Sequence, residues 1–179
     1  MNRRLILNTF AASIATMATG QASARSLHYL LEKKVKAYQA KLEAWAQSPE
    51  VVAFARAGYR KSDSALATAD WQSRTTAPEI RAMLDNEVSR KLSILSQDSS
   101  VAKLILLNSV GDVLGATRKP LQYNLGDTLA FTEAVFSGAW AANRARIDPV
   151  TKKYVVTASA PILERNREIG VLYLQLFAD

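Results

Sequence analysis

The feature that most constrains the fold is a predicted β-hairpin near the end of the 179-residue chain. The segments Tyr154–Pro161 and Arg167–Phe177 are rich in β-branched and aromatic residues, and a charged turn separates them. In the second segment Leu172, Leu174 and Leu176 alternate with other side chains, so the three leucines share one face of a strand. We therefore expect a sheet with a leucine-rich face, and a helix packed on that face.

The first part of the chain has the periodicity of helices. Apolar residues recur at spacings of three and four over residues 27–45, which predicts a long amphipathic helix with Ser26 as its cap. A proline-containing break at residues 48–50 precedes a shorter helix, which should end at Gly58.

The pattern changes from helices to strands at Val101. Before that point we expect a polar loop at residues 60–75 and a third helix, which begins with a capping box at residues 76–79 and ends near Gln97. Strands are expected at residues 101–108, 113–117, 139–147, 154–161 and 167–177, with a short helix at residues 128–138. The predicted fold class is α+β: a five-stranded antiparallel sheet with the long helix on one face, and the short helix and loops enclosing a cavity on the other.

The first 24 residues have the features of a secretory signal peptide. Arg3 and Arg4 precede a short apolar stretch, and small residues stand at positions 22–24. We expect export, cleavage after Ala24 and a periplasmic location. An uncleaved anchor or an ordinary helix are the alternatives, and the two arginines leave both Sec and twin-arginine export open. The predicted divisions are residues 1–24 (signal peptide), 25–100 (helical segment) and 101–179 (sheet core).

Composition excludes several classes of function. The chain has no cysteine, so a disulfide framework, a thiolate metal site and a cysteine nucleophile are excluded. His28 is the only histidine, and no metal or other cofactor is expected. No catalytic motif or nucleophile–base pair is recognisable, which favours a non-catalytic protein. The net charge is +7, and it is +5 without Arg3 and Arg4 of the first 24 residues. This charge is thinly spread, so nucleic acid is not an expected partner, whereas an anionic ligand is compatible.

Four motifs follow one another in the second half of the chain: LILLNSVGDVLGAT, NLGD, FTEAVFSG and SAPILERNREIGVLYLQL. Their order and spacing resemble those of the extracytoplasmic Cache sensor domains, also called PDC domains, which are PAS-like. The resemblance implies a non-catalytic domain that binds a small molecule between its sheet and loops. Many amino-acid-binding members carry Arg-x-Trp-Tyr at the start of the short helix, where this chain has Leu129-Ala130-Phe131-Thr132. That arrangement for holding an α-carboxylate is therefore missing here.

Two arginines in the predicted strand at residues 139–147 are candidates for binding an anion. Alternation places Trp140, Arg144 and Arg146 on one face of this strand. Paired guanidinium groups can hold a carboxylate or phosphate through forked hydrogen bonds, and the tryptophan can wall the pocket. Solvated arginines that protect an edge strand are the alternative.

Polar residues on the last two strands are the other candidates. Thr157 and Ser159 share one face, and Tyr173 and Gln175 should face the cavity. A buried Gln175 needs a hydrogen-bond partner, which can be a ligand or a satisfied core network. The predicted ligand-binding set, in which Tyr123 and Phe131 are lid candidates or ordinary core residues, is Tyr123, Phe131, Trp140, Arg144, Arg146, Tyr154, Thr157, Ser159, Tyr173 and Gln175.

Together these features predict an exported, soluble sensor or binding domain for a small anionic metabolite, such as an organic or amino acid. Because only two residues follow the last predicted strand, we expect signalling through a separate membrane protein: a kinase, cyclase or chemoreceptor. The alternative is a ligand-free adaptor that docks on an envelope protein through its long helix. The near-heptad spacing of residues 27–45 also allows a homodimer, although packing on the chain's own sheet is the simpler hypothesis.

Overall fold

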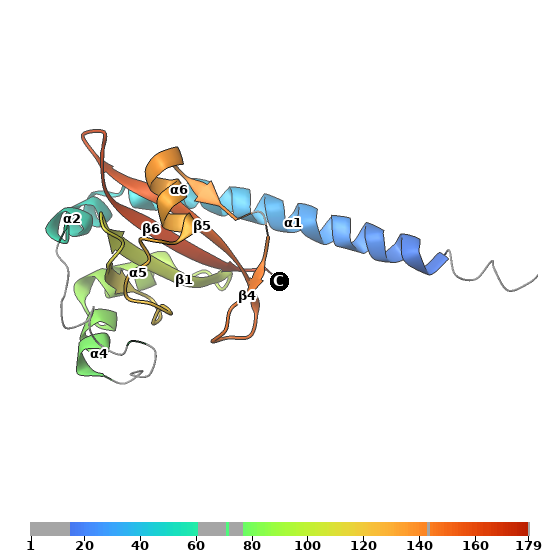
Figure 1. Ribbon diagram of the computed structural model, residues 1–179, viewed down its shortest axis with the longest axis horizontal. Helices are drawn as coiled ribbons and strands as arrows, with labels where there is room; N and C mark the ends of the chain where they lie inside the picture. The colour runs from blue at the N-terminus through green and yellow to red at the C-terminus, as the bar shows by residue number, and fades with distance from the viewer. Residues whose placement is uncertain (1–14, 61–70, 72–76, 143, 179) are drawn as a thin grey trace, which may run out of the picture. The chain divides into compact units, whose positions relative to one another are not determined.

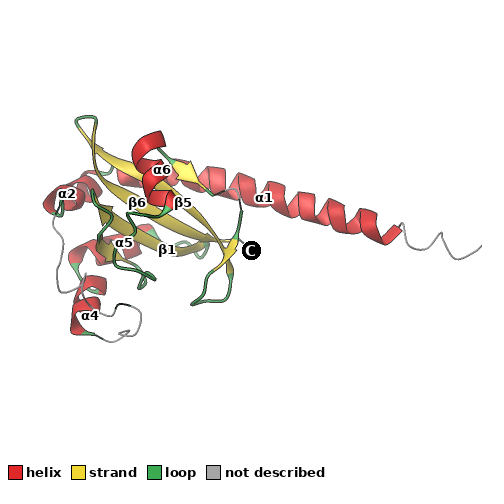
Figure 2. Ribbon diagram, in the orientation of Figure 1, coloured by secondary structure: helices red, strands yellow, loops and turns green. Residues whose placement is uncertain are grey.

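The computed structural model describes residues 15–60, 71, 77–142 and 144–178, with side chains from Tyr29 onward. The chain forms two compact units, Met1–Lys34 and Val35–Asp179. Figures 1 and 2 show the helices and strands. Their bounds are α1 Ala15–Ala46, α2 Pro49–Ala57, α4 Pro78–Leu84, α5 Glu87–Leu95, β1 Val101–Asn108, β2 Val113–Ala116, α6 Leu129–Ser137, β3 Trp140–Ala141, β4 Arg146–Ile147, β5 Tyr154–Glu164 and β6 Arg167–Phe177.

A single antiparallel sheet forms the centre of the second unit. Its strand order is β2-β1-β6-β5-β3, and β4 pairs separately with β5. The central strand β6 pairs with β1 from Val101↔Leu176 to Asn108↔Gly170, and it pairs with β5 along its whole length. The predicted α+β fold with an antiparallel sheet is confirmed.

Strands β5 and β6 form the predicted hairpin. Their two-residue turn is Arg165–Asn166, and both residues have positive φ angles, of 50° and 64°. Two consecutive left-handed residues match the twist of the flanking strands. The predicted end of β5 at Pro161 is wrong, because the strand continues to Glu164. The neighbouring strand β3 reaches only as far as Ser159, so β5 is an edge strand at the proline, where a missing N–H is tolerated.

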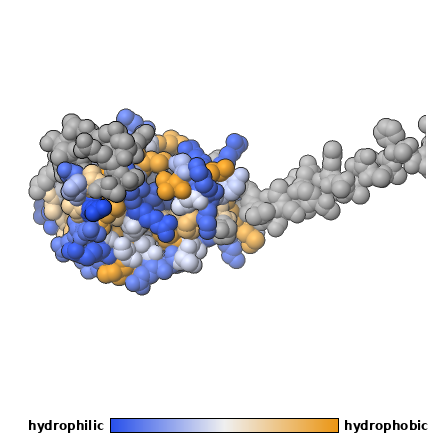
Figure 3. Space-filling view, turned by 90° about the horizontal axis from the view of Figure 1, so that it is seen from below, coloured by the Kyte–Doolittle hydropathy of each residue, from blue (hydrophilic) through white to orange (hydrophobic). Residues whose placement is uncertain are grey.

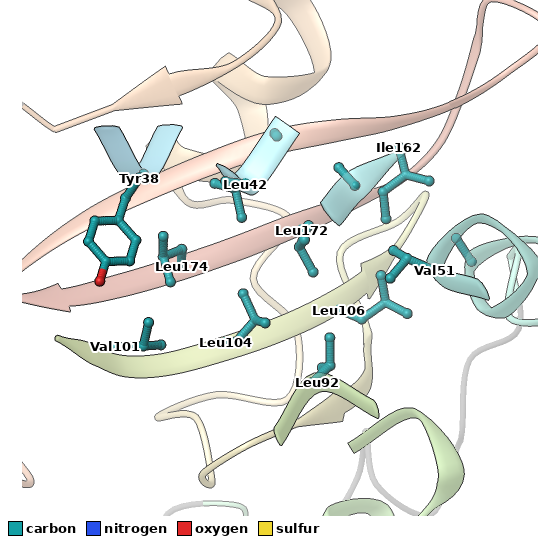
Figure 4. Close-up of a cluster of buried hydrophobic side chains, with 14 of the residues drawn as sticks. Tyr38, Leu42, Val51, Leu92, Val101, Leu104, Leu106, Ile162, Leu172 and Leu174 are labelled. Atoms are coloured by element: carbon teal, nitrogen blue, oxygen red, sulfur yellow. The ribbon is translucent and has the colours of Figure 1, made fainter. Parts of the chain in front are cut away.

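Helices α1, α2 and α5 cover the leucine-rich face of the sheet. Leu172 and Leu174 of β6 pack with Tyr38 and Leu42 of α1, as the close-up in Figure 4 shows. Three of these four side chains, the leucines, have no exposed surface. The predicted packing of the leucine face on the long helix is confirmed. From Val35 onward, the apolar stripe of α1 is used by the domain's own core.

The opposite face of the sheet is covered by α6, α4 and the loop before α6. Phe131 and Ala134 of α6 pack with Ile105 of β1 and Val171 of β6. Thr128 caps the start of α6 by accepting a hydrogen bond from the Phe131 amide. The short helix at residues 128–138 is therefore confirmed, and this face is the one on which a ligand site was expected.

The helical part differs from prediction at several boundaries. Because α1 begins at Ala15, Ser26 lies inside the helix and does not cap it. The N-cap of α4 is Ala77, which makes no side-chain cap. Thr76, with which the predicted capping box begins, lies outside the described residues. Of the predicted loop at residues 60–75, only Arg60 and Trp71 are described. The predicted signal peptide lies partly outside the described residues, and its cleavage stays a prediction.

The third predicted helix is two helices, α4 and α5. Asn86 separates them because its side chain accepts a hydrogen bond from the Ser89 amide and donates one to the Leu114 carbonyl, both of 2.8 Å. The break lets Ile80 of α4 pack on the α6 side of the sheet, while Leu92 of α5 packs on the leucine side.

The predicted strand at residues 139–147 is wrong as a single strand. In β3, Trp140 pairs with Ser159, whereas in β4 Arg146 pairs with Val155. The pairing register therefore shifts by two residues between β3 and β4, and the two are not one continuous strand. Because the shift is even, Trp140 and Arg146 still pair with residues on one face of β5, Ser159 and Val155, whereas Arg144 lies between the two strands.

Glu168 in β6 has a buried Oε1 atom without a hydrogen-bond partner among the described residues. Burial raises the pKa of this carboxyl to about 7, against the opposing effects of the Gly170 amide and the Arg167 charge. Because the folded state binds this proton more tightly than the unfolded chain, stability falls as the pH rises from about 4.5 through 7.

We therefore expect Glu168→Gln to raise the melting temperature at pH 8, and the gain to shrink towards pH 4. Thermal unfolding followed by circular dichroism measures both values. Glu43→Gln, on the exposed side of α1, is the control and should change neither. A gain of equal size at both pH values would contradict the titration of Glu168.

Candidate functional site

Polar side chains gather on the α6 side of the sheet, where β1, β6 and β5 lie next to one another. Cross-strand pairing places Lys103 opposite Gln175, and Gln175 opposite Thr157. Tyr173 is the next residue of β6 on the same face. Asp148 of the β4–β5 turn interacts with Lys103 through its charge. We call these five residues (Lys103, Asp148, Thr157, Tyr173 and Gln175) the polar patch.

Gln175 is only partly satisfied within the polar patch. Its amide nitrogen donates a hydrogen bond of 3.2 Å to the Tyr173 hydroxyl, which lies 3.4 Å from the Thr157 hydroxyl. Its Oε1 atom is buried and has no partner among the described residues. An unpaired buried acceptor costs about 1–3 kcal/mol. The patch therefore holds an acceptor that is suited to a donor group on a bound molecule.

Lys103 brings a positive charge into the same row of side chains. It is 6% exposed, and no hydrogen bond or ion pair to its ammonium is found among the described residues. Burial lowers the pKa of Lys103, and the charge of Arg118 acts in the same direction, while the charge of Asp148 opposes them. A buried charge without a hydrogen-bonded partner is costly. This arrangement is suited to binding an anion.

Asp148 does not neutralise Lys103 by direct pairing, because its carboxylate is used within its own turn. It accepts hydrogen bonds from the Thr151 amide, at 2.9 Å, and the Thr151 hydroxyl, at 2.7 Å. Burial alone would raise the pKa of Asp148, but these bonds and the Lys103 charge outweigh burial and lower it. The carboxylate is therefore ionised at neutral pH and adds a negative charge to the polar patch.

The structure brings three residues of the predicted ligand-binding set together: Thr157, Tyr173 and Gln175. Trp140 is half-buried on β3, and it pairs with Ser159 next to the patch. Ser159 is fully buried, and its hydroxyl donates a 2.6 Å hydrogen bond to the Ala130 carbonyl, which joins β5 to α6.

The remaining predicted residues lie outside the polar patch. Tyr123 and Phe131 are buried in the apolar cluster beneath α6. Arg144, Arg146 and Tyr154 are exposed, and the last two belong to the β4–β5 hairpin. The predicted ligand roles of these residues stay predictions.

The sequence-based prediction missed Lys103 and Asp148. Lys103 is the one charged residue in the apolar segment VAKLILLN, and a lone lysine in a strand that is buried on both faces was a usable signal. Asp148 was interpreted as a turn residue, which is correct, but its position in the sequence gave no sign that it lies near β1.

No group of three or more histidine, cysteine or acidic residues that could hold a metal is found among the described residues. An open depression of about 610 Å³ lies at the turn of the β5–β6 hairpin, and it is lined by Arg56, Glu164, Arg165 and Arg167. Arg56 donates a 2.6 Å hydrogen bond from Nε to the Glu164 carboxylate, and this pairing offsets part of the positive charge of the depression.

No protein-family model matches the sequence. No curated protein matches it either. Among solved structures, the chain is similar to the sensor domain of the Vibrio cholerae histidine kinase DctB, with a TM-score of 0.63 and 10% identity over 91% of this chain and 56% of that one. This similarity decides the fold. The chain has the fold of a Cache-type sensor domain.

A second solved structure agrees with this Cache-type fold. It is the ligand-binding domain of the Pseudomonas aeruginosa PAO1 amino acid chemoreceptor PctC in complex with GABA, with a TM-score of 0.50 and 12% identity. The match covers 90% of this chain and 61% of that one. The chain thus spans less than two thirds of the length of these solved domains. The resemblance inferred from the four motifs is confirmed at the level of the fold.

Replacing Lys103 with methionine tests whether its buried charge is costly. Methionine keeps the apolar stem and removes the ammonium, so we expect Lys103→Met to stabilise the domain at neutral pH by about 1 kcal/mol, or roughly 2–4 °C in melting temperature. Lys36→Met, at an exposed position of α1, is the matched control and should have little effect. A Lys103→Met variant that melts below the parent would show that the lysine is well paired.

Proposed function

We propose that the chain is a Cache-type sensor domain whose polar patch binds a small anionic metabolite, such as an organic or amino acid. The observation that carries this proposal is the largely buried Lys103 side chain in the same cross-strand row as the unpaired Gln175 Oε1 atom. The ammonium would attract a carboxylate, and the amide oxygen would accept a hydrogen bond from a hydroxyl or amino group.

The arrangement favours a ligand with a carboxylate and a separate hydrogen-bond donor. Lys103 would contact the carboxylate, while Gln175 and the ionised Asp148 would favour the donor. The PctC domain, which shares the fold, is in complex with GABA, a molecule with both kinds of group. Trp140 pairs with Ser159 next to the patch, and Tyr123 and Phe131 belong to the apolar cluster against which Tyr173 packs. These three residues are proposed as the apolar surroundings of the ligand.

Isothermal titration of small carboxylates and amino acids into the full chain tests this function. We expect at least one of them to bind, and we expect Lys103→Met to weaken that binding about tenfold or more, because a charge-assisted bond is lost. Lys36→Met should bind like the parent. Because the pKa of Lys103 is lowered, the lysine loses its charge at a lower pH than an ordinary lysine does. The affinity for the anion should therefore begin to fall at a lower pH.

Two results would contradict the proposal. One is a screen in which no small anion or amino acid binds. The other is a Lys103→Met variant that binds the ligand as tightly as the parent, which would place the site elsewhere, for example at Arg144 and Arg146.

We further propose that the domain acts in the periplasm after cleavage behind Ala24, and that a separate membrane-bound kinase, cyclase or chemoreceptor reads its state. The similar solved domains come from a histidine kinase and a chemoreceptor, which supports such a partner. In the part of the chain that the structure describes, no helix is long and apolar enough to span a bilayer. We infer a non-catalytic role, since both similar domains are sensory.

The alternative of a ligand-free adaptor has less support. It would dock through the long helix, but the apolar stripe of α1 from Val35 to Ala46 packs on the chain's own sheet. The same packing leaves little apolar surface on that part of α1 for the homodimer that residues 27–45 allowed.

A further inference from the structure

The β4–β5 hairpin carries an exposed apolar group that the proposed ligand site does not use. Ile147, Val150 and Tyr154 expose 55%, 67% and 59% of their surface. Ile147 and Tyr154 are direct cross-strand partners, and Val150 lies in the turn between them. Figure 1 shows this turn extending beyond the paired strands, below the label β4. We call these three residues the hairpin apolar group.

The exposed charged residues of the hairpin itself, between positions 144 and 154, are all positive. Arg144, Arg146, Lys152 and Lys153 are exposed. Asp148 is the single acidic residue between positions 144 and 154, and its carboxylate is buried, bonded to Thr151 and within range of the Lys103 charge. The one negative charge of the hairpin therefore points into the domain and does not offset the basic side chains at the surface.

The turn presents these side chains in a defined conformation. Asp148 donates from its amide to the Lys153 carbonyl and accepts at its carbonyl from the Lys152 amide, both at 2.8 Å. The Thr151 bonds to the Asp148 carboxylate add two further links. A turn that is already ordered loses little conformational entropy when its tip binds a surface.

An anionic lipid bilayer is the partner that fits this combination. Apolar side chains beside lysine and arginine bind at the headgroup boundary, tyrosine favours that boundary, and basic residues are attracted by anionic lipid. A stable protein interface usually buries more than about 1,000 Å² in total. The face shown in Figure 3 carries its hydrophobic residues in small separate groups on a largely hydrophilic surface.

We propose that the β4–β5 hairpin binds the surface of an anionic phospholipid bilayer. The hairpin apolar group enters the headgroup boundary, and Arg144, Arg146, Lys152 and Lys153 contact lipid phosphates. This contact is independent of the proposed ligand site. It would hold the domain at the membrane surface, where a membrane-bound partner is found by diffusion in two dimensions.

The absence of cysteine from the chain allows a site-specific test with the full-length protein. An environment-sensitive fluorophore is attached to Val150→Cys, and vesicles of phosphatidylglycerol and phosphatidylcholine in equal parts are added. We expect a blue shift, and quenching by a lipid-bound spin label, because position 150 enters the boundary. Phe136→Cys on α6 is the matched control: its residue is 85% exposed, and its fluorophore should not respond.

Charge is tested in the same assay with Arg146→Gln and Lys152→Gln added to Val150→Cys. Each removed charge should weaken binding to the mixed vesicles about fivefold, since one basic residue contributes about 1 kcal/mol near an anionic surface. Four results would each overturn the proposal. Two concern position 150: no response there, or a response equal to that at position 136. The others are an equal response to pure phosphatidylcholine and a response to protein concentration without vesicles.

Discussion

The pairing of β6 on both of its edges determines the position of every functional element in the second unit. β1 lies on one side of β6 and β5 on the other, so the alternation of β6 is transmitted across the sheet. One set of its side chains, which includes Leu172 and Leu174, packs with α1, and the other set includes Tyr173 and Gln175. A register shift of one residue would exchange the two faces and place Gln175 against α1.

The alternation of β6 also explains how much could be predicted from the sequence. The hairpin, the leucine face and the short helix depend on local patterns, and they were predicted correctly. The predicted anion site depended on Arg144 and Arg146 sharing a continuous strand, whereas Arg144 lies between β3 and β4 and only Arg146 belongs to a strand. Lys103 and Asp148 come within range of each other's charge only through tertiary packing, and no local sequence pattern encodes that proximity.

The polar patch lowers the stability of the fold, and it provides groups that can bind a charged ligand. A largely buried lysine whose ammonium lacks a hydrogen-bonded partner destabilises the domain, and groups with perturbed pKa values cluster at functional sites. Asp148 belongs both to this patch and to the turn that carries the proposed membrane contact. A bound anion beside Lys103 would therefore lie close to the hairpin at the bilayer surface.

The most direct test of the polar patch is the pKa of Lys103 itself. Carbon-13 NMR of labelled lysine side chains, with Lys103→Arg used to assign the resonance, follows its titration in the free domain. We predict a pKa clearly below the ordinary lysine value of 10.5, because burial outweighs the charge of Asp148. A pKa at or above the ordinary value would show that Lys103 is solvated or fully paired, and it would contradict its role as the cation that binds the ligand.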